Sequence, residues 1–214
     1  MDLFSNEQDL SALSYNEVEQ LAARCQRCQL AKGRTKVVFG NGPVPCNLML
    51  IGEAPGADED LQGFPFVGRA GKLLTQILAS VNINRPDDIY IANTVKCRPP
   101  ENRAPLAVEQ AACAPYLEYQ LKTVRPKILL LTGTPAVKAV LKIDEPMTKI
   151  RGKWFKLGST NIEVMPIFHP AYLLRNPSKE KGSPKWLTWQ DMQEIKHALE
   201  YVKKIDELSV NSNE

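Results

Sequence analysis

Residues 48–74 read LMLIGEAPGADEDLQGFPFVGRAGKLL, and this stretch indicates the fold. The apolar run at 48–51 has the length of a buried strand, and it breaks into a loop that carries Glu53 and Glu59. Apolar residues then recur at helical spacing over 73–81. In open α/β sheets a ligand binds beyond the carboxyl ends of the strands, which is where this loop would lie. We therefore expect a strand–loop–helix unit whose loop holds a ligand.

The rest of the chain alternates between strand and helix patterns. Further strands are expected at 89–95, 128–133, 153–157 and 162–167, and helices at 15–24, 69–82, 106–124, 134–141 and 188–208. Thr134 is the expected cap of its helix, and Gly158 lies in the turn between the last two strands. Such alternation predicts an α/β fold. We expect a three-layer α/β/α sandwich with a central, mostly parallel four-stranded sheet.

The composition is that of an ordinary globular protein. Of the 214 residues 43% are hydrophobic and 24% are charged, and the net charge of +3 permits a polyanionic partner without requiring one. This length suits one α/β domain, expected at 1–208, with a polar C-terminal tail at 209–214. No apolar run reaches the length of a membrane span, and the acidic N-terminus is unlike a signal peptide. We expect a cytoplasmic protein without membrane association.

Four of the five cysteines form a candidate metal site. Cys25 and Cys28 make a C-x2-C pair among polar residues, which is a poor setting for buried apolar thiols, and Cys97 and Cys113 follow later. In a cytosolic protein such a set is more typical of metal or redox chemistry than of disulfides. Four thiolates suit either structural zinc or an iron–sulfur cluster, and the spacing leaves both open. Cys46 merely precedes a strand and fits a small buried hydrophobe.

Three strand ends each carry a distinctive polar group. Glu53 follows the first strand, Asn93 lies at the end of the second, and His169 follows the last. An asparagine amide can read the edge of a base, a histidine can stabilise developing charge, and Phe66 in the first loop could stack on a planar ligand. Taken singly, these residues also fit a turn cap, a hydrogen-bonded histidine, a core ring and a solvated carboxylate. Their common place at one edge of the sheet favours a binding site.

Several motifs resemble the iron–sulfur uracil-DNA glycosylases known as family four. The motifs are CQRCQLAKGRTKVVFGNG (25–42), GEAPGADEDLQGFPFVGRAGKLL (52–74), NTVKCRPPENRAP (93–105), FHPAYLLRNPS (168–178) and GSPKWLTW (182–189). They cover nearly the whole chain, and several motifs in the correct order are a more specific signal than one short pattern. The resemblance implies a structural 4Fe–4S cluster. Its ligands would be Cys25, Cys28, Cys97 and Cys113.

The activity implied by the resemblance is the removal of uracil from DNA. The enzyme would rotate the nucleotide out of the stack and cleave its N-glycosidic bond, which yields free uracil and an abasic site. Asn93 would read the base and exclude cytosine, while Phe66 would stack on the ring. His169, together with backbone N–H groups around Ala54 and Pro55, would stabilise the negative charge on the departing base.

A carboxylate near the sugar would stabilise its oxocarbenium character and position the attacking water. The best-known uracil glycosylases carry an aspartate where this chain has Ala54, whereas family-four members carry a small residue there. The identity of the carboxylate is therefore open between Glu53 and Glu59. We rank Glu53 first because it adjoins the position in question.

The stretch HPAYLLRNP at 169–177 would be a loop that inserts into DNA. Leu173 or Leu174 would fill the space left by the flipped base, and Arg175 and Lys179 would contact phosphates, so that affinity falls with salt. We expect the protein to act on uracil-containing DNA as a monomer. Two other hypotheses are a non-catalytic nucleic-acid-binding module and a nucleotide-processing α/β enzyme. The lack of a GxxxxGK[ST] phosphate loop disfavours the nucleotide-processing enzyme.

Overall fold

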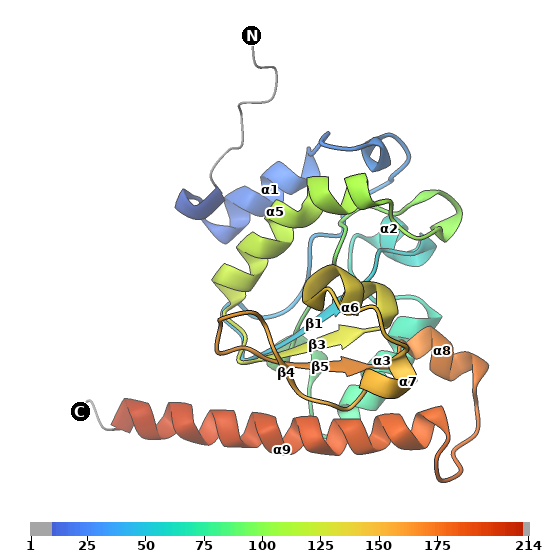
Figure 1. Cartoon of the computed structure of the whole chain (residues 1–214). Coiled ribbons are helices and arrows are strands. Elements are labelled where there is room, and N and C mark those ends of the chain that lie inside the picture. Colours follow the sequence, from blue (N-terminus) through green and yellow to red (C-terminus); the bar gives the residue numbers. More distant parts are fainter. Residues whose placement is uncertain (1–9, 212–214) are drawn as a thin grey trace.

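A five-stranded sheet forms the centre of the molecule (Figure 1). The computed structural model of the chain describes residues 10–211, and the strand order within them is β2-β1-β3-β5-β4. The strands are β1 (Leu48–Gly52), β2 (Tyr90–Asn93), β3 (Ile128–Thr132), β4 (Phe155–Lys156) and β5 (Glu163–Ile167). Strands β1, β2, β3 and β5 run parallel, and β4 pairs antiparallel with β5.

The expected fold class is confirmed, although the sheet has one strand more than the four expected. Strand β4 is two residues long and pairs Phe155 with Val164 and Lys156 with Glu163. It is the first arm of the hairpin that the sequence suggested around Gly158. Because only two of its residues join the ladder, it is a short antiparallel edge beside four parallel strands.

Helices cover both faces of the sheet and complete the three layers. The α-helices are α1 (Tyr15–Ala23), α2 (Ala57–Gln62), α3 (Arg69–Ala79), α4 (Arg85–Asp88), α5 (Ala107–Val124), α6 (Thr134–Leu141), α7 (Met147–Ile150), α8 (Pro170–Arg175) and α9 (Pro184–Asn211). Short 3-10 turns lie at Leu10–Ala12, Gln29–Lys32 and Pro100–Asn102. Figure 1 shows α9 along one side of the sheet and α5 and α6 on the other. Within the described part of the chain, no helix is long and apolar enough to cross a membrane.

Strand β1 shows why the sheet needs helices on both faces. Its side chains point alternately to opposite faces. Leu48 and Leu50 join a core with residues of α3 and α9, whereas Met49 and Ile51 join a core with residues of α5 and α6. Every residue of β1 and β3 is buried. Such continuous burial is typical of parallel strands between two helical layers.

The strand order creates a switch point between β1 and β3. After β1 the chain moves to β2 on one side, and after β3 it moves to β4 and then β5 on the other. In open α/β sheets the ligand crevice lies outside the carboxyl ends of the strands at such a point. The four parallel strands end at Gly52, Asn93, Thr132 and Ile167, so their ends meet at this edge.

Several helix boundaries differ from the sequence expectations. Thr134 is the first residue of α6 and not its cap, because Gly133 occupies the cap position. Helix α9 begins earlier than expected, at Pro184, since proline needs no N–H partner in the first turn of a helix. It also continues to Asn211, beyond the expected domain boundary at 208, and residues 212–214 of the expected tail lie outside the described residues. The first loop contains α2, which its polar sequence did not signal.

Candidate active site

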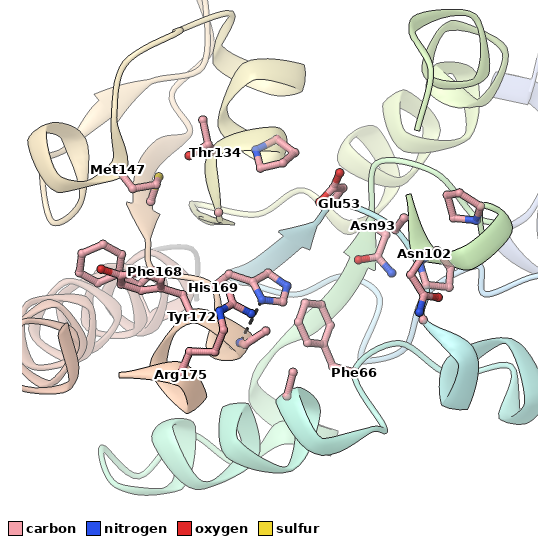
Figure 2. Close-up of a pocket in the computed structure, with 18 of the residues that line it drawn as sticks. Glu53, Phe66, Asn93, Asn102, Thr134, Met147, Phe168, His169, Tyr172 and Arg175 are labelled. Carbon is pink, nitrogen blue, oxygen red and sulfur yellow. Dashed lines mark hydrogen bonds between the residues drawn. The ribbon is translucent and has the colours of Figure 1, made fainter. Parts of the chain in front are cut away.

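A cavity of about 880 Å³ opens at the carboxyl edge of the sheet. All four parallel strands contribute to its wall, through Glu53, Asn93, Thr134 and His169 at or just past their ends. Figure 2 shows Asn93, His169 and the Phe66 ring around one hollow. The structure thus brings together side chains that are far apart in the sequence. The volume is in the range of small-molecule sites and is larger than one pyrimidine needs.

Asn93 presents a buried acceptor that has no partner. The residue ends β2, pairs in register with Gly52, and is only 2% exposed. Its Oδ1 atom makes no hydrogen bond to any residue that the structure describes. Leaving a buried amide oxygen unsatisfied costs about 1–3 kcal/mol, so a ligand donor is the natural partner for this atom. A Cβ on Gly52 would collide with Oδ1 and with the Phe66 ring, and only glycine fits there.

Phe66 has a backbone conformation that residues other than glycine rarely adopt. Its φ is 53°, in the left-handed region. The guanidinium of Arg85 donates to the carbonyl oxygens of Pro65 and Phe66, and Gly71 lies so close to the Phe66 carbonyl that a Cβ would collide with it. The ring centroids of Phe66 and His169 lie 5.8 Å apart. A strained residue held on several sides is typical of a ligand site.

The two candidate carboxylates have different surroundings. Glu59 accepts hydrogen bonds from the N–H groups of Gly56, Val67 and Gly68 at 2.9–3.1 Å, so both of its oxygens close the loop around Phe66. Glu53 makes no side-chain hydrogen bond within the described residues, and burial raises its pKa. Both residues line the cavity. Glu53 is therefore the carboxylate that is left to act on a ligand.

The loop after β1 is tied to the end of β2. The Thr94 hydroxyl donates to the Glu53 carbonyl at 2.6 Å, which fixes Glu53 relative to Asn93. The sequence suggested backbone donors around Ala54 and Pro55. Proline carries no N–H, so the N–H groups of Glu53 and Ala54 are the ones that can serve. This corrects the set of candidate donors by removing Pro55.

His169 is a neutral donor. It caps α8, and its Nδ1 accepts a hydrogen bond from the N–H of Ala171 at 3.1 Å. The imidazole proton therefore sits on Nε2. Burial, together with the nearby charge of Arg175, lowers the pKa of His169 to about 4. A neutral imidazole at the end of a strand can donate to a ligand oxygen and stabilise negative charge that develops there.

The stretch that the sequence suggested as an inserting loop is helix α8. This helix turns Leu173 inward, where it is only 1% exposed, so Leu173 could enter DNA only if this helix moved. Leu174 is 37% exposed and keeps that role as a candidate. Arg175 lines the cavity. Lys179 is exposed beyond α8 and is not among the lining residues.

Other lining residues were not predicted as ligand contacts from the sequence. They include Arg103, and also Thr134, Met147 and Tyr172, which reach the cavity from separate elements (Figure 2). Arg103 is held by the Glu109 carboxylate through two hydrogen bonds of 2.7 and 2.9 Å. Arg103 and Tyr172 lie within two of the quoted motifs, but only the folded sheet brings their elements together at the cavity.

The four predicted cysteine ligands meet at a second, small cavity. Cys25 and Cys28 follow α1, Cys97 follows β2, and Cys113 lies in α5. Electrostatic interactions join Cys97 to Cys28 and Cys113, and Cys113 to Cys25 and Cys28. All four are free thiols. Three separate segments thus converge on one set of sulfur atoms.

Burial raises the pKa of the Cys97 and Cys113 thiols, and nearby positive groups and N–H donors partly offset that rise. Arg34 donates to Cys97 Sγ at 3.4 Å, and the backbone N–H of Lys96 donates to Cys113 Sγ at 3.3 Å. Neighbouring cations and N–H donors favour the thiolate, which is the form that binds metals. No group of three or more His, Cys, Asp or Glu side chains in residues 10–211 is arranged to hold a single metal ion. Four cysteine thiols are the donor set that iron–sulfur clusters use.

Comparison with known proteins finds similarity to uracil glycosylases. Residues 39–193 match the family model of the uracil DNA glycosylase superfamily. A type-4 uracil-DNA glycosylase from Thermotoga maritima is 40% identical over 191 residues, which cover 87% of this chain and 94% of the relative. One from Sulfurisphaera tokodaii is 41% identical over 174 residues, which cover 78% and 79%. A type-5 uracil-DNA glycosylase from Pyrobaculum aerophilum is 28% identical over 202 residues, which cover 77% and 86%.

Proposed function

Because the chain belongs to the uracil-DNA glycosylase superfamily and, within it, to the type-4 family, we propose that it initiates base excision repair by removing uracil from DNA. The bond between uracil N1 and the deoxyribose C1′ breaks, and the oxygen of one water molecule bonds to C1′. A proton of that water ends on the departing uracil. The products are free uracil and an abasic site. A stacked base cannot reach the cavity, so the nucleotide must first rotate out of the DNA.

The unpartnered Oδ1 of Asn93 is the observation that carries this proposal. Uracil presents an N3–H donor beside its O4 acceptor, and one asparagine amide can match both with its oxygen and its NH2 group. Cytosine presents the opposite pattern at these two positions, so a fixed amide would be left with mismatched partners. Phe66 stands beside the amide and would stack on the pyrimidine ring.

His169 would stabilise the departing base. As the C1′–N1 bond breaks, negative charge develops on uracil, and part of it lies on O2. The Nε2–H of a neutral His169 and the N–H groups of Glu53 and Ala54 are donors that can meet this charge. Preorganised donors of this kind are worth about 3–4 kcal/mol of the activation barrier each.

Glu53 would stabilise the positive charge that develops on the sugar. The deoxyribose takes on oxocarbenium character in the transition state, and an ionised carboxylate nearby stabilises it and accepts a hydrogen bond from the attacking water. Glu59 was the other candidate. Its oxygens are already used by three backbone N–H groups, which supports a role in holding the Phe66 loop.

The rim of the cavity would grip the DNA. Arg175 lines it, and Lys179 lies beyond the same helix, so both can contact phosphates. Leu174 is the exposed apolar side chain that could occupy the place of the flipped base. Phosphate contacts of this type release counterions, so the affinity for DNA should fall as salt rises.

We also propose that Cys25, Cys28, Cys97 and Cys113 hold a 4Fe–4S cluster. The convergence of four free thiols and the nearby positive groups support this assignment, as does membership of the type-4 family. A cluster bound here would cross-link the segment after α1, the segment after β2, and helix α5. Its contribution is structural, and the chemistry of uracil release is left to the residues of the cavity.

The activity is tested with a strand that contains a single uracil. Incubation with the protein followed by alkali should cut the strand at the uracil, and a matched strand with cytosine should stay intact. Glu53→Ala should slow the release far more than Glu59→Gln. A uracil strand that survives both steps would instead favour a non-catalytic binding module.

The cluster is tested by colour and metal content. The purified protein should be brown with broad visible absorbance, and Cys97→Ala should remove that absorbance. Cys46→Ala is the matched control, because Cys46 is also a buried free cysteine but lies in a different core cluster. A colourless protein with stoichiometric zinc would contradict the assignment.

A further inference from the structure

Lys96 is a buried lysine that lies between the cavity and the cysteines. It is only 2% exposed, although lysine is almost never fully buried unless it is paired. Its Nζ donates to the backbone carbonyl of Asn93 at 2.8 Å and to Oε1 of Gln120 at 2.5 Å. One of its two partners is thus the residue that would read the base.

The ammonium of Lys96 lacks a carboxylate partner. No ion pair of Lys96 occurs among the described residues, and its two hydrogen-bond acceptors are neutral oxygens. A buried charge is costly unless an opposite charge lies nearby. Its Nζ lies 5.9 Å from the centroid of the Phe39 ring, and the sulfur atoms of Cys113 and Cys97 interact with it electrostatically. Iron-bound thiolates there would supply the missing negative charge.

Lys96 also closes the turn that joins the two sites. Asn93 is the last residue of β2, and Cys97 follows four positions later. The Lys96 side chain reaches back to the Asn93 carbonyl, while the Lys96 backbone N–H donates to Cys113 Sγ. One residue therefore contacts both the base-reading end and the sulfur end of this short segment.

We propose that Lys96 is a positioning residue, which balances the charge of the cysteine-bound cluster and holds the backbone from which the Asn93 amide reaches the base. This inference rests on the proposed function. An amide that is displaced by a fraction of an ångström reads uracil poorly, because a misplacement of about 1 Å can cost on the order of 100-fold in rate. The cysteine centre would then influence uracil recognition through Lys96.

A double-mutant cycle between Lys96 and Asn93 tests the positioning role. The measurement is the single-turnover rate of uracil release with enzyme in excess. Lys96→Met should slow release by about 10- to 100-fold in the wild-type background, yet by less than about 2-fold in an Asn93→Ala background, because residues that act through one another are not additive. Equal losses in both backgrounds would overturn the positioning role, since a general structural defect acts on both alike.

The midpoint potential of the cluster tests the counter-ion role. Lys96→Met removes a positive charge beside the cluster, so reduction becomes harder and the potential should shift to a more negative value. An unchanged potential would overturn this role. If Lys96→Met does not fold, Lys96→Gln removes the charge but keeps a neutral donor, and the same negative shift is expected of it.

Tyr90→Phe is the matched control. The Tyr90 hydroxyl bonds to Gln120 and Tyr15 in the same buried network, and it is not one of the two hydrogen-bond partners of the Lys96 ammonium. Release rate and potential should both stay at wild-type values, and a loss as large as that of Lys96→Met would overturn the proposal. A wild-type protein that leaves uracil strands intact would instead defeat the proposed function, while the potential would still decide the role of Lys96.

Discussion

Polar groups at the two ends of the central sheet differ in whether they have bonding partners within the protein. At the carboxyl end, Asn93 keeps a buried oxygen without a partner, Phe66 has a strained backbone, and His169 is buried without charge. Each of these features lowers stability, because buried polar groups and unusual backbone angles both cost free energy. They occur together where a ligand would bind.

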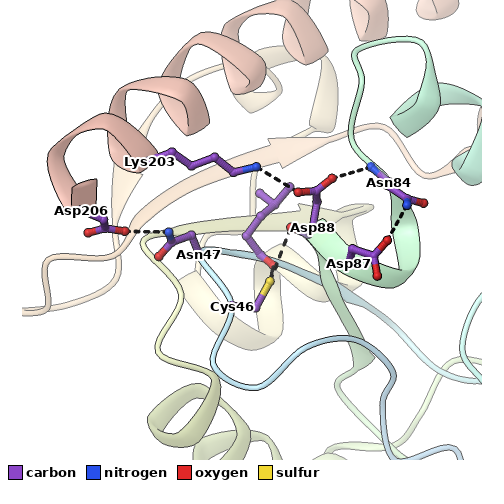
Figure 3. A network of polar contacts seen from close by, with 8 residues as sticks. Cys46, Asn47, Asn84, Asp87, Asp88, Lys203 and Asp206 are labelled. Carbon is purple, nitrogen blue, oxygen red and sulfur yellow. Dashed lines mark hydrogen bonds and ion pairs between the residues drawn. The ribbon is translucent and has the colours of Figure 1, made fainter. Parts of the chain in front are cut away.

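At the amino end of the same sheet, polar side chains form a bonded network (Figure 3). Asn47, directly before β1, donates to Asp206 of α9 at 2.8 Å, and Lys203 of α9 forms an ion pair with Asp88 at 2.9 Å. The carboxylate of Asp88 also accepts from the Asn84 N–H at 2.8 Å. These bonds join α9 and α4 to the start of the sheet.

The contrast indicates how stability and function are divided along the strands. Bonds at the amino end hold the layers together, and the carboxyl end is left with groups that only a ligand can satisfy. A change at the amino end should therefore affect stability without affecting uracil release. A change at the carboxyl end should affect mainly uracil release, and in one case it should even stabilise the protein.

Asn93→Leu is expected to have the largest effect. Leucine has a similar shape but no acceptor, so the rate of uracil release should fall by about 1000-fold or more, as for loss of a central transition-state contact. The free energy of unfolding should rise by about 1 kcal/mol, because a buried unsatisfied oxygen is removed. Single-turnover kinetics and urea unfolding measure the two quantities. A clear loss of stability would mean that Oδ1 has a partner in the free protein.

The pH dependence of release should report Glu53. Burial raises the pKa of Glu53 above its ordinary value of 4.5, whereas His169 stays neutral down to about pH 4. The rate should therefore fall about tenfold per pH unit on an acid limb whose midpoint lies above 4.5. Glu53→Gln should be slow and show no such limb above pH 5. If the acid limb persists in this variant, another titrating group causes it.

Stability should respond to pH through His169. Its pKa falls from 6.5 in the unfolded chain to about 4 in the fold, so the unfolded state binds the extra proton in this window. Stability is therefore lost as pH drops from 6.5 to 4, by at most about 3 kcal/mol. Urea unfolding of wild type and His169→Gln at pH 7 and pH 4.5 isolates this term, since other titrating groups cancel in the difference. Parallel losses in both proteins would contradict it.

Arg85→Met should have a moderate effect. Arg85 satisfies the carbonyl oxygens behind the Phe66 turn, and without it the ring would lose its fixed position. We expect kcat/KM for uracil release to fall by about 10-fold, mainly through a higher KM. The free energy of unfolding should fall by about 1–2 kcal/mol, because the carbonyl oxygens are left unsatisfied. Arg85→Lys keeps one donor and should recover part of the loss. Unchanged kinetics for Arg85→Met would show that the Phe66 turn keeps its conformation without Arg85.

The sequence predicted those parts of the site that depend on strand ends. Because parallel strands share one carboxyl edge, finding the strands at once placed Glu53, Asn93 and His169 on the same side. The four cysteines were also identifiable, since a C-x2-C pair in a polar context has few other uses. Both predictions rest on local patterns that the fold preserves.

The rest depended on contacts between distant segments. Leu173 looked exposed in a loop, but α8 forms and turns it into the core. Arg85 and Lys96 carried no signal, because a charged residue in the sequence is normally read as solvent-exposed. Glu59 was the second candidate for the carboxylate near the sugar, and only the folded loop reveals the backbone N–H groups from which it accepts hydrogen bonds. The spacing of residues along the sequence predicts strand ends, but it does not predict which side chains bond to one another in the fold.

Lys203→Met at the amino end should have the smallest effect and gives the comparison its sharpest test. The ion pair with Asp88 is partly exposed, and such pairs contribute between about 0 and 1 kcal/mol. Urea unfolding should show a loss within this range that shrinks further in high salt, because salt screens exposed charges. The rate of uracil release and the KM should equal those of the wild type. A slower release in this variant would mean that the two ends of the sheet are coupled, and that the division between stabilising and ligand-binding ends does not hold.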